Sequence, residues 1–288
     1  MATIAIIGPG AVGGVIAGWL TRRGGHDLTL CARRPPGDMT VELSSGPVKL
    51  TAKVLTDPTL ARPVDWVLVT TKAYDAAGAA AWFPSLVGPQ SRVGILQNGV
   101  EHRERFTPYL NAAQLLPVMV DCPAERPAPG RIIQRGPGRL AVPAGPDGAA
   151  FADLFAGTDL EVGQVADFKT AIWRKLCLNS VGAINALLLK PAGIFQNEDI
   201  GRLAVQLARE CIAVGRAEGA VLEDGLAETI LEACRKAPPD SVNSLHADRA
   251  AGRPMEIDAR NGAVVRFGRK HGIPTPCNEM AALLLAAM

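Results

Sequence analysis

The sequence lacks the features that mark nucleic-acid binding, metal binding and insertion into a membrane. Its 30 basic and 28 acidic residues nearly cancel, and no long block of like charges occurs, so nothing predicts a nucleic-acid partner. The six cysteines form no C-x-x-C pair and the four histidines have no metal-ligand spacing, so neither a metal site nor a disulfide framework is expected. No apolar run approaches the roughly 18 residues that span a bilayer, and no secretory leader is recognisable. We therefore expect a soluble, cytoplasmic protein with small-molecule partners and no membrane contact.

The composition is that of an ordinary globular protein, with 48% hydrophobic and 20% charged residues. A length of 288 residues is about twice that of a usual domain, which predicts two domains with a cleft between them as the default active site.

The first half of the chain alternates short apolar runs, each bounded by turn residues, with helical patterns. This rhythm predicts parallel strands joined by crossover helices, with strands over residues 3–7, 28–31, 66–70, 93–96 and 118–120. Two short apolar segments within residues 132–142 flank a turn at 135–138 and predict an antiparallel hairpin that closes the sheet. A last short strand is expected over residues 160–162.

From residue 168 onward, helical apolar spacing replaces the strand pattern. We therefore predict an α/β fold in which a Rossmann-type doubly wound sheet precedes an all-helical C-terminal domain. The boundary near Asp167 gives a dinucleotide-binding domain over residues 1–167 and a helical substrate or dimerisation domain over residues 168–288.

A glycine turn joins the first predicted strand to the first predicted helix, with the sequence Gly8-Pro9-Gly10-Ala11-Val12-Gly13. In this context Gly8 allows a tight turn, Gly10 lets a pyrophosphate approach the backbone, and Gly13 lets the helix pack closely. The phosphates would then meet backbone N–H groups at a helix N-terminus. The alternative is a tight strand-to-helix turn without a ligand.

About 20 residues later, where an NAD enzyme usually carries a carboxylate for the ribose 2′-hydroxyl, the chain has Cys31-Ala32-Arg33-Arg34. A guanidinium offers a fixed charge and a bidentate fork to a 2′-phosphate, so Arg33 predicts NADP(H) rather than NAD. Whether Arg34 shares the phosphate is open, and an exposed surface pair of arginines is the alternative.

Polar residues follow two further strands, at the edge where open α/β sheets bind ligands. Thr71-Lys72 follows one strand and Gln97-Asn98-Gly99 follows the next. Lys72 and Asn98 can both face the nicotinamide half of a cofactor. An ordinary solvated lysine and a left-handed turn asparagine are the alternatives.

The helical half contributes further polar candidates. Lys175 and Asn179 lie four residues apart among apolar residues, so they share a helix face where poor solvation would lower the pKa of the lysine toward neutrality. Such a lysine suits the donation of a proton to a developing alkoxide, although it could also extend from a helix edge into solvent. Ser244 and Asp248 are again four apart, and Glu256 is expected in the first turn of a later helix, where an acid also complements the helix dipole.

Together these residues resemble the ketopantoate reductase (2-dehydropantoate 2-reductase) family along essentially the whole chain. The matching pieces occur in the family's order: the glycine turn with its arginine, Thr71-Lys72, Gln97-Asn98-Gly99, Trp173-Arg174-Lys175-Leu176-x-x-Asn179, Ser244-x-x-x-Asp248 and Glu256-Ile257-Asp258-x-x-Asn261-Gly262. The resemblance implies reduction of a small 2-keto acid by NADPH.

The resemblance also assigns roles. Lys175 would be the proton donor, and Asn98 and Glu256 would lie near both the nicotinamide ribose and the substrate. Glu256 would be the second catalytic residue, orienting Lys175 or binding the ribose. Asn179 and Ser244 would hold the 2-keto acid, with Asp248 and Lys72 in support.

Two departures from the family pattern bear on the substrate. Many members carry a second asparagine four residues after the first, where this chain has Ala183; Asn185 would face away unless the helix bulges near Gly182. Met255 stands where threonine is common in the family.

Three hypotheses therefore remain: ketopantoate reduction to pantoate, reduction of another small 2-keto acid, and a non-catalytic NADP-binding redox sensor. An apolar helix over residues 281–287 could serve a homodimer interface.

Overall fold

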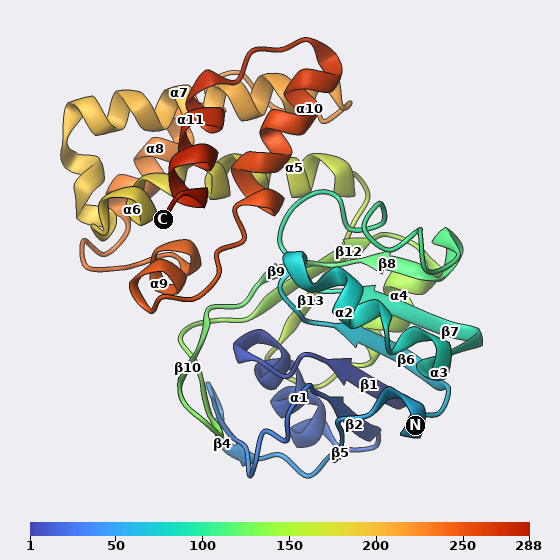
Figure 1. Ribbon diagram of the computed structural model, residues 1–288. Coiled ribbons are helices and arrows are strands. Elements are labelled where there is room, and N and C mark those ends of the chain that lie inside the picture. Colours follow the sequence, from blue (N-terminus) through green and yellow to red (C-terminus); the bar gives the residue numbers. More distant parts are fainter. The chain divides into compact units, whose positions relative to one another are not determined.

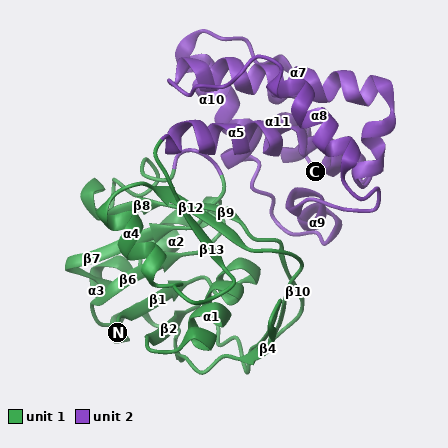
Figure 2. Ribbon diagram, turned by 180° about the vertical axis from the view of Figure 1, so that it is seen from behind, with its two compact units in different colours: residues 1–98, 102–166 green, residues 99–101, 167–288 purple.

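The computed structural model describes residues 1–288 as two compact units (Figure 1). Unit 1 comprises residues 1–98 and 102–166, and unit 2 comprises residues 99–101 and 167–288 (Figure 2). The segment 99–101 groups with unit 2 because Gly99 packs against the Ala259 carbonyl and Glu101 pairs with Arg266 at 2.5 Å. A boundary near Asp167 alone would place this segment in the first domain.

Unit 1 is built on a six-stranded, fully parallel sheet with the strand order β5-β2-β1-β6-β7-β8. Numbered along the chain within this sheet, the order is 3-2-1-4-5-6, which is that of the Rossmann fold and reverses direction between β1 and β6. The strands are β1 (Thr3–Ile7), β2 (Asp27–Cys31), β5 (Lys53–Leu55), β6 (Val64–Val69), β7 (Val87–Ile95) and β8 (Leu115–Pro117).

Helices cover both faces of this sheet, which is why its central strands are apolar without alternation. Ile4 and Ile6 of β1 pack with residues of α1 (Ala11–Arg23) and α4 (Pro146–Asp153) on one face. Ala5 and Ile7 of the same strand pack with α2 (Ala76–Ala80) and α3 (Phe83–Leu86) on the other. The predicted parallel sheet with crossover helices is confirmed.

The predicted hairpin within residues 132–142 is wrong. Its two segments, β11 (Arg131–Gln134) and β12 (Arg139–Pro143), belong to different small sheets, with the orders β10-β11-β3-β4 and β13-β12-β9. In these sheets β11 pairs with β10 (Ala124–Ala128) and β3 (Thr40–Leu43), whereas β12 pairs with β9 (Met119–Asp121) and β13 (Glu161–Val165). β11 thus forms its hairpin with the preceding strand β10 rather than with β12, and its other partner, β3, is distant in the chain.

Two further differences concern strands. The hairpin of β3 and β4 (Gly46–Lys49) and the edge strand β5 are strands of only three or four residues, so the sequence pattern misses them. The parallel strand predicted over 118–120 is wrong: the parallel sheet ends with β8 at Pro117, and β9 begins at Met119 and pairs antiparallel with β12 in another sheet.

Unit 2 is helical, as predicted, and is arranged around its longest helix, α7. Asn197 caps α7 by accepting hydrogen bonds from the N–H groups of Asp199 and Ile200. The buried residues of α7 recur with helical spacing, at Ala204, Leu207, Ala208 and Cys211. The helices are α5 (Phe168–Val181), α6 (Ala183–Leu188), α7 (Glu198–Ala217), α8 (Leu226–Lys236), α9 (Ser244–Ala250), α10 (Ala263–His271) and α11 (Pro276–Ala286). None of the helices is long and apolar enough to cross a membrane.

Candidate functional site

The glycine turn between β1 and α1 has a separate steric reason for each glycine. Gly8 has a φ of +84°, and a Cβ there would lie 2.6 Å from Thr71 Cγ2. A Cβ on Gly13 would overlap the hydroxyl of Thr70, which itself donates to the carbonyl of Gly8 at 2.8 Å. A Cβ on Gly10 would meet nothing closer than 3.9 Å, so this glycine faces open space. Gly8 and Gly13 thus shape the turn, whereas Gly10 leaves room for a ligand.

The N-terminus of α1 suits an anion. Gly10 occupies the capping position without a side-chain cap, no acidic residue lies in the first turn, and Arg22 and Arg23 lie in the last. Helix N-termini leave backbone N–H groups for an outside acceptor, and the helix dipole favours negative charge there. The turn therefore has the features that a pyrophosphate site requires, over the residues Gly8-Pro9-Gly10-Ala11-Val12-Gly13.

The second strand carries the candidate phosphate-binding arginine. The N–H of Gly8 donates to the carbonyl of Cys31 at 2.9 Å, which ties the glycine turn to the end of β2. Arg33 follows two residues later with 86% of its side chain exposed, and its only ion pair is a long one of 3.8 Å to Asp75. Arg34 is exposed as well. Because exposed pairs at such distances are weak, Arg33 is available to an incoming phosphate.

The buried side chain of Gln97 joins the ends of β6 and β7. Its Nε2 donates to the carbonyl and to the hydroxyl of Thr71, both at 3.1 Å, and reaches the carbonyl of Lys72 at 3.4 Å. These bonds hold Lys72 and Asn98 at one edge of the sheet. The sequence motif includes Gln97, but the sequence does not predict that its side chain positions Lys72.

In unit 2, α5 presents Lys175 and Asn179 one turn apart. Both are half-buried, while Trp173, Leu176 and Cys177 are buried in the helical core. The neighbouring Arg174 pairs with Glu223 at the surface. The predicted lysine and asparagine thus share a polar strip beside an apolar core.

Helix α9 carries Ser244 and Asp248. Asn243 caps this helix by accepting from the N–H of His246 at 3.0 Å, so Ser244, the first helical residue, is not needed as the cap. Asp248 is buried one turn later and accepts from Arg253 Nε at 3.0 Å.

Glu256 is not in the first turn of a helix, contrary to the sequence expectation. The chain from Arg253 to Glu256 has no regular structure, and a π-helical turn over Asp258–Gly262 precedes α10. Asn261 fixes that wide turn by donating to the carbonyl of Ser180 at 3.1 Å and to Asn278 Oδ1 at 2.9 Å. Glu256 is therefore a buried carboxylate, 4% exposed, rather than a capping residue.

The two departures noted in the sequence have structural counterparts. The helix divides at Gly182, between α5 and α6, and Ala183 is fully buried in the core of unit 2. Asn185 is buried too: its Nδ2 donates to the Lys190 carbonyl and its Oδ1 accepts from Asn243, both at 3.0 Å. The side chain of Asn185 is thus used in hydrogen bonds within unit 2, and Met255 packs against the hydrophobic core of that unit.

Sequence reasoning missed Arg260, which lies in the π-helical turn and is 3% exposed. Its Nη2 donates to Ser244 Oγ at 2.7 Å, and its Nε is buried without a hydrogen-bond partner. Burial lowers the pKa of this guanidinium from its usual value, an effect that Glu256 and Asp248 oppose. No sequence signal distinguishes this residue from a surface arginine of a helix.

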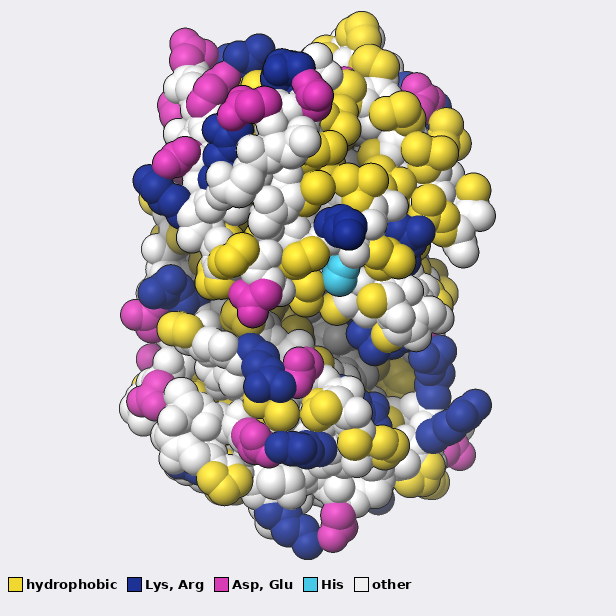
Figure 3. Space-filling model, turned by 90° about the vertical axis from the view of Figure 1, so that its left-hand side faces the viewer, with side chains coloured by type: hydrophobic (Ala, Val, Ile, Leu, Met, Phe, Trp, Pro, Cys, Tyr) yellow, Lys and Arg dark blue, Asp and Glu magenta, His cyan; other side chains and the backbone are white.

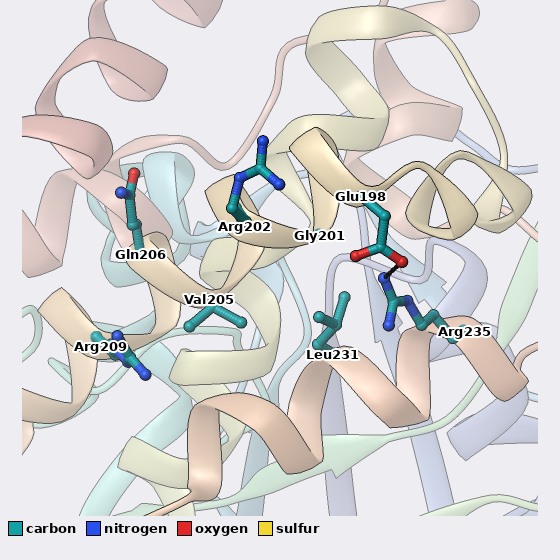
Figure 4. A pocket seen from close by; sticks show the side chains of 8 residues that line it. All are labelled: Glu198, Gly201, Arg202, Val205, Gln206, Arg209, Leu231 and Arg235. Carbon is teal, nitrogen blue, oxygen red and sulfur yellow. Dashed lines mark hydrogen bonds and ion pairs between the residues drawn. The ribbon is translucent and has the colours of Figure 1, made fainter.

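A pocket of about 310 Å³ lies elsewhere in unit 2, between α7 and α8 (Figure 4). An ion pair between Glu198 and Arg235 spans one side of it. None of the candidate residues above lines this pocket, so it is separate from the predicted chemistry.

Comparisons with known proteins place these features in a family. The description "Ketopantoate reductase PanE/ApbA" belongs to a family model that matches residues 4–147, and the model of its C-terminal domain matches residues 167–288. A 2-dehydropantoate 2-reductase of Caulobacter vibrioides is 54% identical over 287 residues, covering 100% of this chain and 99% of the relative.

Solved structures agree with this. A ketopantoate reductase of the same family from Ralstonia eutropha has 32% identity and a TM-score of 0.90, over 99% of this chain and 97% of that one. A ketopantoate reductase from Staphylococcus aureus, described as dimeric, has 24% identity and a TM-score of 0.88, over 99% and 98% of the two chains, which shows the shared fold. This chain is an oxidoreductase that belongs to the ketopantoate reductase family.

Proposed function

We propose that this protein reduces 2-dehydropantoate to pantoate with NADPH, and that Lys175 donates the proton. The observation that carries the proposal is the end-to-end identity of 54% with a relative named 2-dehydropantoate 2-reductase. The polar strip of Lys175 and Asn179 on α5 supports the assignment of roles, because a reductase needs a proton donor beside groups that hold its substrate.

Unit 1 supplies the cofactor site in this proposal. The N–H groups at the start of α1 bind the pyrophosphate, and the open space at Gly10 lets it approach. Arg33 binds the 2′-phosphate by exchanging its long contact with Asp75 for a charge-assisted bond. Lys72 and Asn98, held together by Gln97, face the nicotinamide half. When bound, the cofactor supplies a hydride to C2 of the substrate.

Unit 2 supplies the substrate and proton groups. Lys175 gives its proton to the oxygen on C2 as negative charge develops there, and Asn179 and Ser244 donate hydrogen bonds to the keto acid. Glu256 acts beside the nicotinamide ribose and the substrate, and Asp248 supports Ser244 from the next turn of α9.

A second candidate substrate is another small 2-keto acid. It is favoured by one observation: Ala183 is buried and Asn185 is committed to Lys190 and Asn243, so the second amide of the family pattern does not lie on the polar strip of α5. A lost hydrogen bond changes which substrate is accepted without changing the fold.

Steady-state kinetics with NADPH separate the two substrates. The proposal predicts that kcat/KM is highest for 2-dehydropantoate among unbranched and branched 2-keto acids. Negligible turnover of 2-dehydropantoate beside good turnover of a simpler keto acid would favour the second candidate. Tight NADPH binding without turnover of any carbonyl would contradict both.

We also propose that the protein forms a homodimer through α11. This helix buries Ala281 and Leu285, yet its Met280, Leu283 and Leu284, with Met288 just after its end, expose between 47% and 66% of their surface. A helix that is apolar all round is normally covered on both sides. Hydrophobic side chains gather in the upper right of Figure 3, with few charged ones among them.

Light scattering after size exclusion tests the dimer. Leu283→Glu should shift the mass from dimer to monomer, whereas Val221→Glu, at an even more exposed apolar position in the connection between α7 and α8, should not. A monomeric wild-type protein at micromolar concentration would refute this interface.

A further inference from the structure

Arg260 is a buried cation without an ion pair of its own. Its guanidinium donates to Ser244 Oγ at 2.7 Å, and its Nε–H has no acceptor although it is buried. The carboxylates of Glu256 and Asp248 act on its charge without forming an ion pair with it, and Asp248 is engaged by Arg253 at 3.0 Å. Removing a charge from water is costly unless it is paired, so this arrangement is expensive for stability alone.

Ser244 connects this buried charge to the surface. Its oxygen accepts from Arg260, so its own hydroxyl proton is left to donate elsewhere. A serine at the start of a helix commonly caps it, but Asn243 does so here. Ser244 is exposed, whereas Arg260 lies behind it in the interior of unit 2.

A hydroxyl that accepts from a guanidinium is polarised toward donating its proton to an anion, because linked hydrogen bonds strengthen one another. The charge of Arg260 acts in the same direction, and burial keeps solvent from screening it. Direct contact between Arg260 and the ligand is not required.

We propose that Arg260, acting through Ser244, makes this site select substrates that carry a carboxylate beside the keto group. Ser244 donates the hydrogen bond to that carboxylate, and Arg260 is the positioning residue that orients the hydroxyl and supplies positive charge. The inference rests on the proposed 2-keto acid reduction and extends it to a residue at an unspecified position of the family motif described above.

The test compares 2-dehydropantoate with its methyl ester, which keeps the ketone and loses the charge. In the wild type kcat/KM should favour the acid, and Arg260→Met should reduce that preference by about 10- to 100-fold, the range of a hydrogen bond to a charged group. Arg260→Lys should restore part of the preference. A purely structural role would lower acid and ester turnover equally and leave their ratio unchanged.

Arg269→Met is the matched control, because Arg269 is an arginine of the same unit whose side chain and whose ion-pair partner, Glu279, are both exposed. It should leave the acid-to-ester ratio within about twofold. Should Arg260→Met fail to fold, as judged by thermal unfolding, Ser244→Ala tests the same subsite and must also reduce the ratio. An unchanged ratio in the Arg260 variant, or in Ser244→Ala, overturns the inference.

A wild type that reduces neither compound refutes the proposed function instead. The subsite is then judged by the dissociation constants of the acid and the ester, measured by calorimetry in wild type and Arg260→Met. The same relative loss of acid binding is expected, and its absence overturns the inference.

Discussion

Replacing Arg33 by aspartate should change the cofactor preference while leaving the fold intact. Arg33 is 86% exposed and its contact with Asp75 is 3.8 Å long, so its loss should cost at most about 1 kcal/mol of unfolding free energy. A hydrogen bond between a guanidinium and a phosphate contributes about 2 kcal/mol, so NADPH should lose roughly 30-fold in kcat/KM. The new carboxylate can accept from the ribose 2′-hydroxyl of NADH, so the NADPH-to-NADH ratio should fall further, by about 100-fold in all.

The assay is the oxidation of each cofactor under saturating keto acid, with thermal unfolding measured in parallel. Arg62→Asp, at another exposed arginine of unit 1, is the matched control and should leave the ratio unchanged. Arg34→Asp decides whether that residue shares the phosphate. A ratio within twofold of wild type in the Arg33 variant would show that the 2′-phosphate is held elsewhere.

Lys175→Met should lower kcat by about 100- to 10,000-fold with little change in the dissociation constant of NADPH, because a general acid acts in the chemical step. Arg174→Met, at the exposed neighbouring residue, is the control and should retain activity. A small effect of Lys175→Met on kcat would exclude Lys175 as the donor. Gly13→Ala should unfold at a lower temperature because its Cβ overlaps Thr70, whereas Gly10→Ala should keep its stability and lose NADPH affinity in a fluorescence titration. Equal melting losses in both would contradict the separate roles of the two glycines. Asn185→Ala should lower the unfolding free energy by about 1–3 kcal/mol in denaturant titrations, since it removes the acceptor of one Asn243 N–H and the side-chain donor to the Lys190 carbonyl. A selective rise in KM at full stability would instead place Asn185 in the substrate site.

The sequence predicts those parts of the fold that local patterns determine. β1 is a short apolar run that ends in a glycine turn, and its bounds agree with the prediction at both ends. The pairing of β11 depends on β3, where Ile132 lies opposite Val41, about 90 positions earlier in the chain. No local turn signal contains that information, and the hairpin that β11 does form uses the turn before it, toward β10, rather than the predicted turn after it.

The candidate site likewise has some residues that local patterns predict and others that depend on distant contacts. The spacing of Lys175 and Asn179 on one helix face follows from helical periodicity, so the sequence is sufficient to place them together. Arg260 and Glu256 depend on the irregular segment before α10 and on the contacts of Asn261, which join parts of the chain that are far apart. Burial of a charged residue is a tertiary property, and periodicity alone does not reveal it for Arg260.

Transfer of hydrogen from the cofactor to the substrate tests the central proposal most directly. The wild-type protein is incubated with NADPH that carries deuterium at the transferable C4 position and with 2-dehydropantoate, and the product is examined by mass spectrometry and NMR. We predict pantoate with one deuterium at C2. Pantoate without the label, or no pantoate although NADPH binds, would contradict the proposed reaction.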